Sequence, residues 1–401
     1  MRYTRFKRYQ INKKATRGVA KKHPWIFSGN LSSAAESFQD GEYLKLYDGE
    51  NNLLAFGILS KDEKIAVRLF HFGETLKNRF FFKKLRDIWS KKEKLCDETN
   101  AIRYVNGECD QLPGLFVDLY NDVAVVSYAS PSLYRMARLI AFLLPQVLPE
   151  HLSKHILVRG KPCNGSRIDF KPARWVRGQA QEKVEIFETK NKFEVYPNNP
   201  QSSGFFMDLR AARRELSKHD FNGMRVLNLF SYTGAFSVLL QKLGAREVVS
   251  VESNRAAIQL HNNNIKLNDL DPAGQEIVCA DVHQYLSKLD DSEKFDFIIF
   301  DPTSMTSSKN RLNQALQKHS VYHKLALKHL NPESLWLSCC RSHHVPKAEL
   351  LKVIGQASKE IIGKGNTQIV VEIKEDIDFS VPGNFSEGHY LKQVLFSNFK
   401  L

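Results

Sequence analysis

The stretch Arg225-Val-Leu-Asn-Leu-Phe-Ser-Tyr-Thr-Gly-Ala-Phe236 decides the fold of the C-terminal half of the chain. Its apolar beginning is typical of a buried strand, and the residues that follow predict a helix over 235–243. Between the two, Gly234 permits close approach of the backbone to a ligand. The stretch therefore predicts a strand, a ligand-binding loop and a helix.

Strands and helices continue to alternate after this stretch. The pattern predicts strands over 247–252 and 295–301, with a helix over 255–267 between them. Such alternation builds a parallel sheet that binds ligands at the carboxyl ends of its strands. We therefore expect an α/β fold with a Rossmann-like domain over residues 191–401.

Two smaller modules are predicted before this domain. Residues 1–72 contain short apolar runs separated by turn residues, which predicts a β-rich module. Residues 73–190 combine helical patterns over 76–100 and 132–149 with strand patterns over 115–128 and from Ile156 onward. They predict a small central α+β domain.

Net charge points to the class of partner. Lys and Arg total 58 against 44 Asp and Glu, which gives a formal charge of +14 and a pI near 9.3. A basic stretch from Arg2 to Lys22 leads into His23-Pro-Trp-Ile-Phe27, which suits phosphate contact beside base stacking. A basic surface beside an ordinary core tryptophan fits the same residues. Nucleic acid is the expected partner, and a merely soluble basic protein is the alternative.

Several classes are disfavoured by composition. No apolar run approaches the roughly 20 residues that cross a bilayer, and no signal-peptide pattern follows Met1, so we expect a cytoplasmic protein without a membrane partner. The six cysteines are scattered without a C-x-x-C pair, so we expect reduced thiols and no metal site. They are Cys96, Cys109, Cys163, Cys279, Cys339 and Cys340.

Acidic residues follow the predicted strands in an order that suits a nucleoside ligand. Glu252 ends a strand about 20 residues after the glycine loop, where an acid accepts hydrogen bonds from both ribose hydroxyls. Asp281 offers a carboxylate where an adenine amino group would lie, and Asp301 follows the next strand. Any one of these acids alone is compatible with an ordinary solvated loop. Because the chain lacks G-x-G-x-x-G at the loop, the pattern argues against nicotinamide or flavin.

At these residues the chain resembles the RlmI-like family of bacterial large-subunit rRNA cytosine-C5 methyltransferases. The resemblance covers nearly the whole chain, and its most specific parts are the Phe-Ser-Tyr-Thr-Gly and Phe-Met-Asp-Leu-Arg runs. The similar stretches are His23–Gly29, Gly107–Gly114, Ser203–Arg210, Leu227–Phe236 and Ser386–Lys392. The resemblance implies a PUA domain, a central domain and a class I methyltransferase domain that uses S-adenosylmethionine, with RNA, in particular large-subunit rRNA, as the substrate and a homodimer as a possible assembly.

The resemblance also implies roles for individual residues. Phe206, Asp208 and Arg210 would lie over the cofactor, and the loop from Phe230 to Gly234 would hold its methionine portion. Glu252 would bind the ribose and Asp281 the adenine ring. The cofactor-binding set is completed by loop and strand-end neighbours, so that it comprises Phe206, Asp208, Arg210, Asn228, Phe230, Ser231, Tyr232, Thr233, Gly234, Glu252, Ser253, Asp281, Val282 and Asp301.

Methylation of cytosine C5 requires a cysteine, because C5 is a poor nucleophile until a thiolate adds to C6. In Leu335-Trp-Leu-Ser-Cys-Cys-Arg341, Cys339 matches the cysteine of the family's Ser-Cys-Ser segment, and Cys340 is the fallback. A structural strand-end thiol is the ordinary alternative for such a residue. Arg341 would favour the thiolate if it lies nearby, and Asp301 would hydrogen-bond the pyrimidine edge.

Two further features leave the reaction open. The adjacent His343 and His344 are candidates for the base that removes the C5 proton, although such a pair also fits a solvated loop. The family's Asp-Pro-Pro motif reads Asp301-Pro302-Thr303 here, which frees the backbone and adds a hydroxyl. Three hypotheses follow: cytosine-C5 methylation, an RNA-binding homologue without turnover, and methylation of another atom or nucleotide.

Overall fold

The computed structural model describes residues 6–31, 37–61, 63–161, 169–199, 203–306, 308–363 and 367–398. The beginning of the predicted basic stretch, up to residue 5, and Cys163 lie outside the described residues. The chain divides into two compact units. The first comprises Met1–Thr189, Val195–Ser203 and Ile377–Gly388, and the second comprises Lys190–Glu194, Gly204–Asp376 and His389–Leu401. The expected domain boundaries near 72 and 190 stay predictions.

The first sheet of the first unit lies where a β-rich module was predicted. Its described strands run in the order β1-β3-β4-β5-β2, and helix α1 (Lys13–Ala20) packs on it. Asn12 caps α1 by accepting a hydrogen bond from the Ala15 N–H. The strands are β1 (Lys7–Gln10), β2 (Trp25–Phe27), β3 (Tyr43–Tyr47), β4 (Leu53–Leu59) and β5 (Ile65–Phe72).

Trp25 belongs to an aromatic cluster of this unit. Its ring lies 5.0 Å from that of Phe385 between centroids, and it also contacts His23 and Phe27 edge to face. Its indole N–H donates a hydrogen bond of 2.9 Å to Glu108. Because the ring is half-buried and its polar atom is paired, Trp25 has a packing role, which was one of the two interpretations of the sequence.

The second sheet of this unit has the described order β10-β9-β8-β7-β6. Its helices are shorter than the periodicity predicted. The first, α2, spans Phe80–Lys92 and continues as a 3₁₀ turn, and α3 spans Tyr134–Leu143 and ends because Pro145 follows. The strands are β6 (Ala101–Asn106), β7 (Leu115–Tyr120), β8 (Val123–Tyr128), β9 (His155–Gly160) and β10 (Arg174–Arg177).

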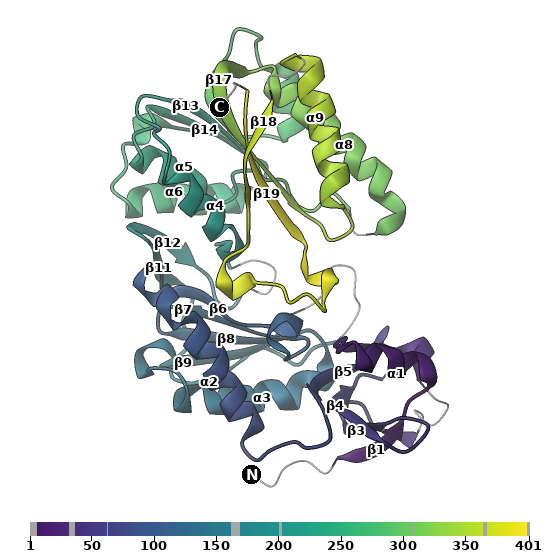
Figure 1. The fold of residues 1–401 in the computed structure, drawn as a ribbon. Coiled ribbons are helices and arrows are strands. Elements are labelled where there is room, and N and C mark those ends of the chain that lie inside the picture. The colour runs from purple at the N-terminus through teal and green to yellow at the C-terminus, as the bar shows by residue number, and fades with distance from the viewer. Residues whose placement is uncertain are drawn as a thin grey trace. The chain divides into compact units, whose positions relative to one another are not determined.

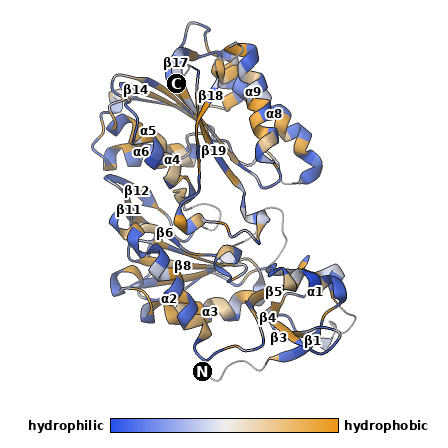
Figure 2. Cartoon of the chain, in the orientation of Figure 1, coloured by the Kyte–Doolittle hydropathy of each residue, from blue (hydrophilic) through white to orange (hydrophobic). Residues whose placement is uncertain are grey.

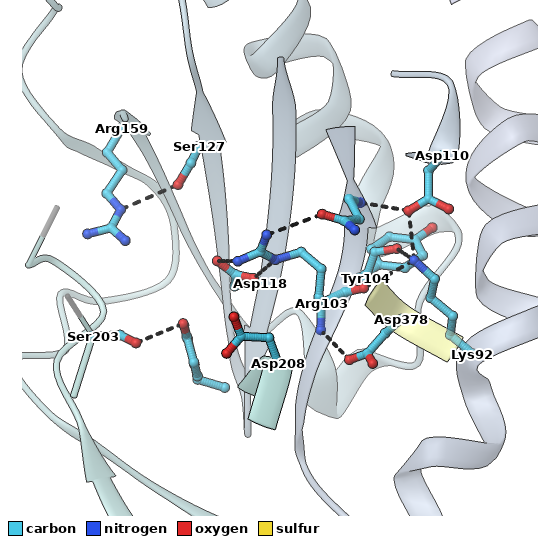
Figure 3. A network of polar contacts seen from close by, with 12 residues as sticks. Lys92, Arg103, Tyr104, Asp110, Asp118, Ser127, Arg159, Ser203, Asp208 and Asp378 are labelled. Atoms are coloured by element: carbon cyan, nitrogen blue, oxygen red, sulfur yellow. Dashed lines mark hydrogen bonds and ion pairs between the residues drawn. The ribbon is translucent and has the colours of Figure 1, made fainter. Parts of the chain in front are cut away.

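Charged side chains lie in a buried network beside these strands (Figure 3). The ammonium of Lys92, which is 3% exposed, donates to Asp110 at 2.7 Å and to the backbone carbonyls of Arg103 and Tyr104. The guanidinium of Arg103 pairs with Asp118 on the neighbouring strand. Each buried charge in these pairs thus has an opposite partner, as burial requires.

The second unit contains the predicted parallel sheet. Its described strands run in the order β15-β14-β13-β16-β17-β19-β18; β13 to β17 are parallel, and β19 is antiparallel to both β17 and β18. They are β13 (Arg225–Leu229), β14 (Glu247–Glu252), β15 (Gln275–Cys279), β16 (Phe295–Phe300), β17 (Leu330–Arg341), β18 (Gln368–Ile373) and β19 (Leu391–Ser397). The short strands β11 (Val184–Glu188) and β12 (Asn191–Val195) precede this sheet in the chain.

Helices cover both faces of the sheet (Figure 1). On one face lie α4 (Arg210–Leu216), α5 (Ala235–Lys242) and α6 (Arg255–Leu267). On the other lie α7 (Val282–Lys288), α8 (Leu312–Leu327) and α9 (Lys347–Ile361). Apolar residues concentrate along the strands in Figure 2, while the helices carry hydrophilic residues as well. The predicted α/β architecture of this part is confirmed.

Among the described residues, no helix is both long and apolar enough to span a membrane. Within the same ranges, no three His, Cys, Asp or Glu side chains gather as metal ligands would.

Candidate functional site

The site lies at the carboxyl ends of the central strands. Leu229, at the end of β13, pairs with Val251 of β14 on one side and with Phe300 of β16 on the other, and Phe300 pairs with Ser338 of β17. The chain moves outward from β13 in both directions, so the strand order reverses there. Open α/β sheets bind ligands at such a reversal. The loop after β13, Glu252, Asp301 and Arg341 therefore share one edge.

The loop after β13 has an unusual backbone. Phe230 and Tyr232 have positive φ angles of 61° and 50°, as does Gly234 at 79°. The Ser231 N–H donates to the carbonyl of Val251 at 3.1 Å, which ties the loop to β14. Positive φ is strained in side-chain-bearing residues and concentrates at ligand sites. The hydrogen bonds and packing of this loop hold the strained backbone in place.

His261 and Asn264 of α6 support this loop, and the sequence did not single them out. A Cβ atom at Gly234 would lie 2.0 Å from the His261 ring, so only glycine fits. The side-chain amide of Asn264 donates to the carbonyl of Thr233 at 2.9 Å, and the Thr233 hydroxyl donates to the carbonyl of Gly204 at 2.7 Å. The spacing of His261 and Asn264 on one helix face was the available signal.

Backbone groups orient the Glu252 carboxylate. One carboxylate oxygen accepts the Tyr232 N–H at 3.0 Å, and the other accepts the Asn254 N–H at 2.8 Å. Ser253 is exposed, and its hydroxyl lies 3.5 Å from the same carboxylate. Each oxygen keeps a further lone pair, so the carboxylate is held in place yet still able to accept hydrogen bonds from two hydroxyls.

The side-chain hydroxyl of Ser231 has no hydrogen-bond partner among the described residues. It is buried, and a buried hydroxyl normally has such a partner. Asn228, within β13, instead donates to Ser237 of α5 at 2.8 Å, and Ser237 contacts Ser250 of β14 at 2.8 Å. The Ser231 hydroxyl is thus available to a ligand, whereas the amide N–H of Asn228 joins the sheet to α5.

Asp281 and Val282 begin α7 at the same end of the sheet. The Asp281 side chain accepts the Gln284 N–H at 3.0 Å and so caps the helix, while the residue stays exposed. The Val282 side chain is buried in the core. Its backbone N–H belongs to the first turn, where an N–H has no acceptor within the helix.

Asp301 and Arg341 form an ion pair across β16 and β17, with side chains only 9% and 12% exposed. The guanidinium donates to the two carboxylate oxygens at 2.8 and 3.3 Å. It also lies over the Phe206 ring, 3.8 Å from its centroid, and Phe206 contacts Tyr232. Burial raises the pKa of Asp301 even though Arg341 opposes that shift. Phe206 is thereby placed between the loop and the ion pair.

Asp208 and Arg210 point to different partners. Tyr390, to which the sequence assigned no role, donates its hydroxyl to Asp208 at 2.7 Å. Arg210 is 1% exposed and pairs with Asp376 at 3.1 Å, and Arg214 reaches the same carboxylate at 2.8 Å. The contacts of Arg210 therefore tie α4 to the segment after β18.

The two adjacent cysteines of β17 lie on opposite faces of the sheet. Cys339 packs on the face that carries Phe206 and Leu209, whereas Cys340 packs against the α8 and α9 side. Both are buried, at 0% and 2% exposure. Alternation along a strand also places Arg341 on the face of Cys339. The strand geometry thus separates the primary candidate from its fallback.

Neither thiol ionises readily in this environment. Burial, followed by the charge of Asp301, raises the pKa of Cys339 well above its usual range, and Arg341 opposes the shift without cancelling it. Burial raises the pKa of Cys340 to about 11. The expectation that Arg341 favours the thiolate is correct in direction, but burial and the neighbouring carboxylates outweigh it.

Thr303, His343 and His344, whose roles the sequence left undecided, lie near the surface. Thr303 is exposed after the buried Pro302. His343 is exposed and His344 half-buried, with their ring centroids 3.8 Å apart. The exposure of Thr303 shows that the sheet edge accommodates this departure without burying the added hydroxyl.

The comparisons with known proteins point to one family. Residues 163–358 match the family model of S-adenosylmethionine-dependent methyltransferases, and residues 10–72 match that of PUA-like domains. The chain is 30% identical over 391 residues to the ribosomal RNA large subunit methyltransferase I of Serratia proteamaculans, covering 94% of this chain and 95% of that relative. It is 27% identical over 386 residues to the protein of that name from Alteromonas mediterranea, covering 94% and 96%.

Two solved structures share the fold. One is described as a methyltransferase complexed with SAH and has a TM-score of 0.82, and the other is described as a SAM-dependent methyltransferase from Streptococcus mutans and has a TM-score of 0.80. Each is 23% identical and covers 97% of this chain and 99% of its own. The likeness extends through both units.

Proposed function

Because the chain belongs to the ribosomal RNA large subunit methyltransferase I family and uses S-adenosylmethionine, we propose that it methylates C5 of a cytosine in large-subunit rRNA. The observation that carries the proposal is the placement of Cys339 on the same sheet face as Phe206, beside the Asp301–Arg341 ion pair. Methylation at C5 of a pyrimidine needs a cysteine whose sulfur adds to C6.

The residues at the strand ends fit the cofactor. Glu252, oriented by two N–H groups, would bind the ribose hydroxyls, and Asp281 with the Val282 N–H would meet the adenine ring. The unpartnered Ser231 hydroxyl would complete the contacts of the Phe230–Gly234 loop to the methionine portion. When bound, the cofactor supplies an electrophilic methyl group.

The protein's own residues would then activate the base. The sulfur of Cys339 adds to C6, and the electron pair of the C5–C6 double bond moves to C5, which becomes the nucleophile. Arg341 holds Asp301 in a fixed orientation at the edge of the sheet, where the carboxylate would hydrogen-bond the pyrimidine edge. After methyl transfer, loss of the C5 proton and departure of the sulfur restore the aromatic ring.

The first unit would position the RNA. It contains the PUA-like domain, and α1 with its flanks carries Lys13, Lys14, Arg17, Lys21 and Lys22. Such a cluster attracts phosphates in a salt-dependent manner. Ribosomal RNA as the substrate would place the protein in the cytoplasm, and a homodimer stays a prediction.

The test is to identify the product. Purified protein is incubated with deproteinised rRNA and cofactor labelled in its methyl group, and the digested nucleosides are separated. Labelled 5-methylcytidine is the expected product. A different labelled nucleoside would contradict the cytosine-C5 assignment, and salt-sensitive RNA binding without any label would instead support a homologue that has lost turnover.

A further inference from the structure

Asp208 has one paired and one unpaired carboxylate oxygen. Tyr390 donates its hydroxyl to Oδ2 at 2.7 Å. Oδ1 is buried and has no hydrogen-bond partner among the described residues, in a side chain that is only 8% exposed. A buried carboxylate oxygen without a donor is costly, and native structures rarely tolerate one without a function. Oδ1 is therefore able to accept a hydrogen bond or a proton.

The surroundings of Asp208 point to the Cys339 thiol. Leu209, the next residue, packs in the same apolar cluster as Cys339, and Tyr390, which holds Asp208, packs against that cluster. The charge of Asp208 acts on Cys339, on Asp301 and on Arg341. Asp208 and Cys339 thus share one buried face of the sheet.

The other nearby carboxylate is already engaged. Both oxygens of Asp301 accept hydrogen bonds from Arg341, at 2.8 and 3.3 Å. Those bonds engage both oxygens and direct them at Arg341 rather than at the thiol. Oδ1 of Asp208 meets no such donor among the described residues. Of the two carboxylates, Asp208 is the better placed to accept a proton.

We propose that Asp208 is the general base that takes the thiol proton of Cys339 while the Cys339 sulfur adds to C6. This proposal rests on the proposed cysteine route. The S–H bond breaks, its electron pair forms the S–C6 bond, and the proton moves to Oδ1 of Asp208. When the sulfur later leaves C6 with that pair, it recovers the proton from Asp208. The carboxylate returns to its initial state, and the C5 proton is the net proton released.

The environment of the thiol makes such a base necessary. Burial, Asp301, Asp208 and Cys340 all raise the pKa of Cys339, and Arg341 alone among the contributing groups lowers it. A preformed thiolate is therefore scarce at neutral pH, so removing the proton during the attack is the accessible route. General bases of this kind contribute about 100-fold to 10,000-fold in rate.

The first experiment uses no RNA. Iodoacetamide modification of Cys339 is followed by mass spectrometry of its peptide in the wild type, in Asp208→Asn and in the exposed matched control Asp291→Asn. Because the charge of Asp208 disfavours the thiolate, loss of an electrostatic influence alone would make modification faster. Loss of a base makes it slower, and we expect a decrease of about 10-fold or more. Unchanged or faster modification in Asp208→Asn overturns the proposal.

The second experiment adds the reaction. RNA carrying 5-fluorocytidine traps the enzyme covalently after methyl transfer, because fluorine at C5 cannot leave as a proton does. We expect Asp208→Asn to form this adduct about 100-fold more slowly than the wild type. The resemblance places Asp208 over the cofactor, whereas the role as a base predicts that calorimetry shows S-adenosylhomocysteine binding within about twofold, a free-energy change below about 0.5 kcal/mol. Loss of that binding would mark Asp208 as a cofactor ligand and overturn its role as a base.

Tyr390→Phe provides a milder variant. Removing the hydroxyl bond to Oδ2 leaves the carboxylate less firmly oriented, so iodoacetamide modification of Cys339 should slow, though by less than in Asp208→Asn. Modification of Cys339 at the wild-type rate in Tyr390→Phe contradicts the role of Asp208. If slower iodoacetamide modification persists but the wild type forms no adduct, the cytosine route fails while the base assignment stands. If the wild type forms the adduct but Asp208→Asn is modified as fast as the wild type, the base assignment fails while the cytosine route stands.

Discussion

The guanidinium of Arg341 donates two hydrogen bonds, of 2.8 and 3.3 Å, to the carboxylate of Asp301, and it lies over the ring of Phe206. The three residues come from the end of β17, the loop after β16 and the turn before α4. The ion pair therefore joins three segments at the edge where the loop after β13 also lies. Its charges and those around it set the properties of Cys339.

Breaking this ion pair should be destabilising and dependent on pH. Arg341→Gln leaves Asp301 buried without its cation, which costs about 3 kcal/mol of unfolding free energy near neutral pH. The pKa of Asp301 is already raised by burial and should rise further without Arg341. The loss should shrink as pH falls through that raised value, because a protonated carboxyl needs no cation. Urea denaturation at several pH values measures this, and an equal loss at every pH would contradict it.

Gly234→Ala should disrupt the loop. Its Cβ would lie 2.0 Å from the His261 ring, and its φ of 79° is strained for alanine. We expect a loss of about 2 kcal/mol in unfolding free energy, together with loss of S-adenosylhomocysteine binding. Calorimetry measures the binding. Gly223→Ala is the matched control, because its φ of 72° adds similar strain while nothing lies within 4 Å; an equal effect there would argue against the His261 contact.

Glu252→Gln should weaken cofactor binding while preserving the fold. The amide keeps one acceptor oxygen and loses the charge, so hydrogen bonds from ribose hydroxyls weaken. We expect the dissociation constant for S-adenosylhomocysteine to rise about 10-fold to 100-fold, corresponding to roughly 1.5–3 kcal/mol. Glu276→Gln, on the exposed surface of β15, should bind as the wild type does. Unaltered affinity in Glu252→Gln would remove it from the ribose site.

The two cysteines should respond differently to the same change. Cys339→Ser should abolish methyl transfer to RNA, because serine cannot replace the thiolate, while cofactor binding persists. Cys340→Ser should retain most activity and lose about 1–3 kcal/mol of stability, since the hydroxyl is buried on the α8 and α9 side. Transfer of labelled methyl groups and urea denaturation check the pair. Full activity in Cys339→Ser would exclude the thiolate route.

Two buried histidines of α8 should make the protein sensitive to acid. Burial lowers the pKa of His319 to about 3 and that of His323 to about 4, both below the ordinary 6.5. Between about pH 6.5 and 4 these histidines bind protons in the unfolded chain but not in the folded chain. The free energy of unfolding should therefore fall as the pH drops from about 6.5 toward 4. Between pH 7.5 and 4.5 the free energy of unfolding should fall by roughly 2 kcal/mol less in His319→Leu than in the wild type.

Urea denaturation at those two pH values checks this, with His389→Gln at an exposed position as the control. Because no hydrogen bond to the His319 ring nitrogens exists among the described residues, leucine removes the proton site without breaking such a bond. A wild-type stability that stays constant over this pH range would contradict the prediction.

Local sequence determined the strand, loop and helix around Gly234 and the acids at the strand ends. The predicted helix over 255–267 has the bounds of α6, because its period and its Asn254 cap lie within the segment itself. The α2 and α3 predictions were too long where the chain tightened into 3₁₀ turns, and Pro145 explains the second. Because such helices and strands depend on residues that are neighbours along the chain, they can be predicted from the sequence alone.

Tertiary structure alone decided which cysteine faces Phe206, that Asp376 binds Arg210, and that His261 fills the space beside Gly234. Each of these relationships joins segments far apart in sequence. The facing of Cys339 follows from the register of β17 with β16 and β19, and a shift of one residue would exchange it with Cys340. Strand register and helix packing are set by the whole core, which is why no local pattern could state them.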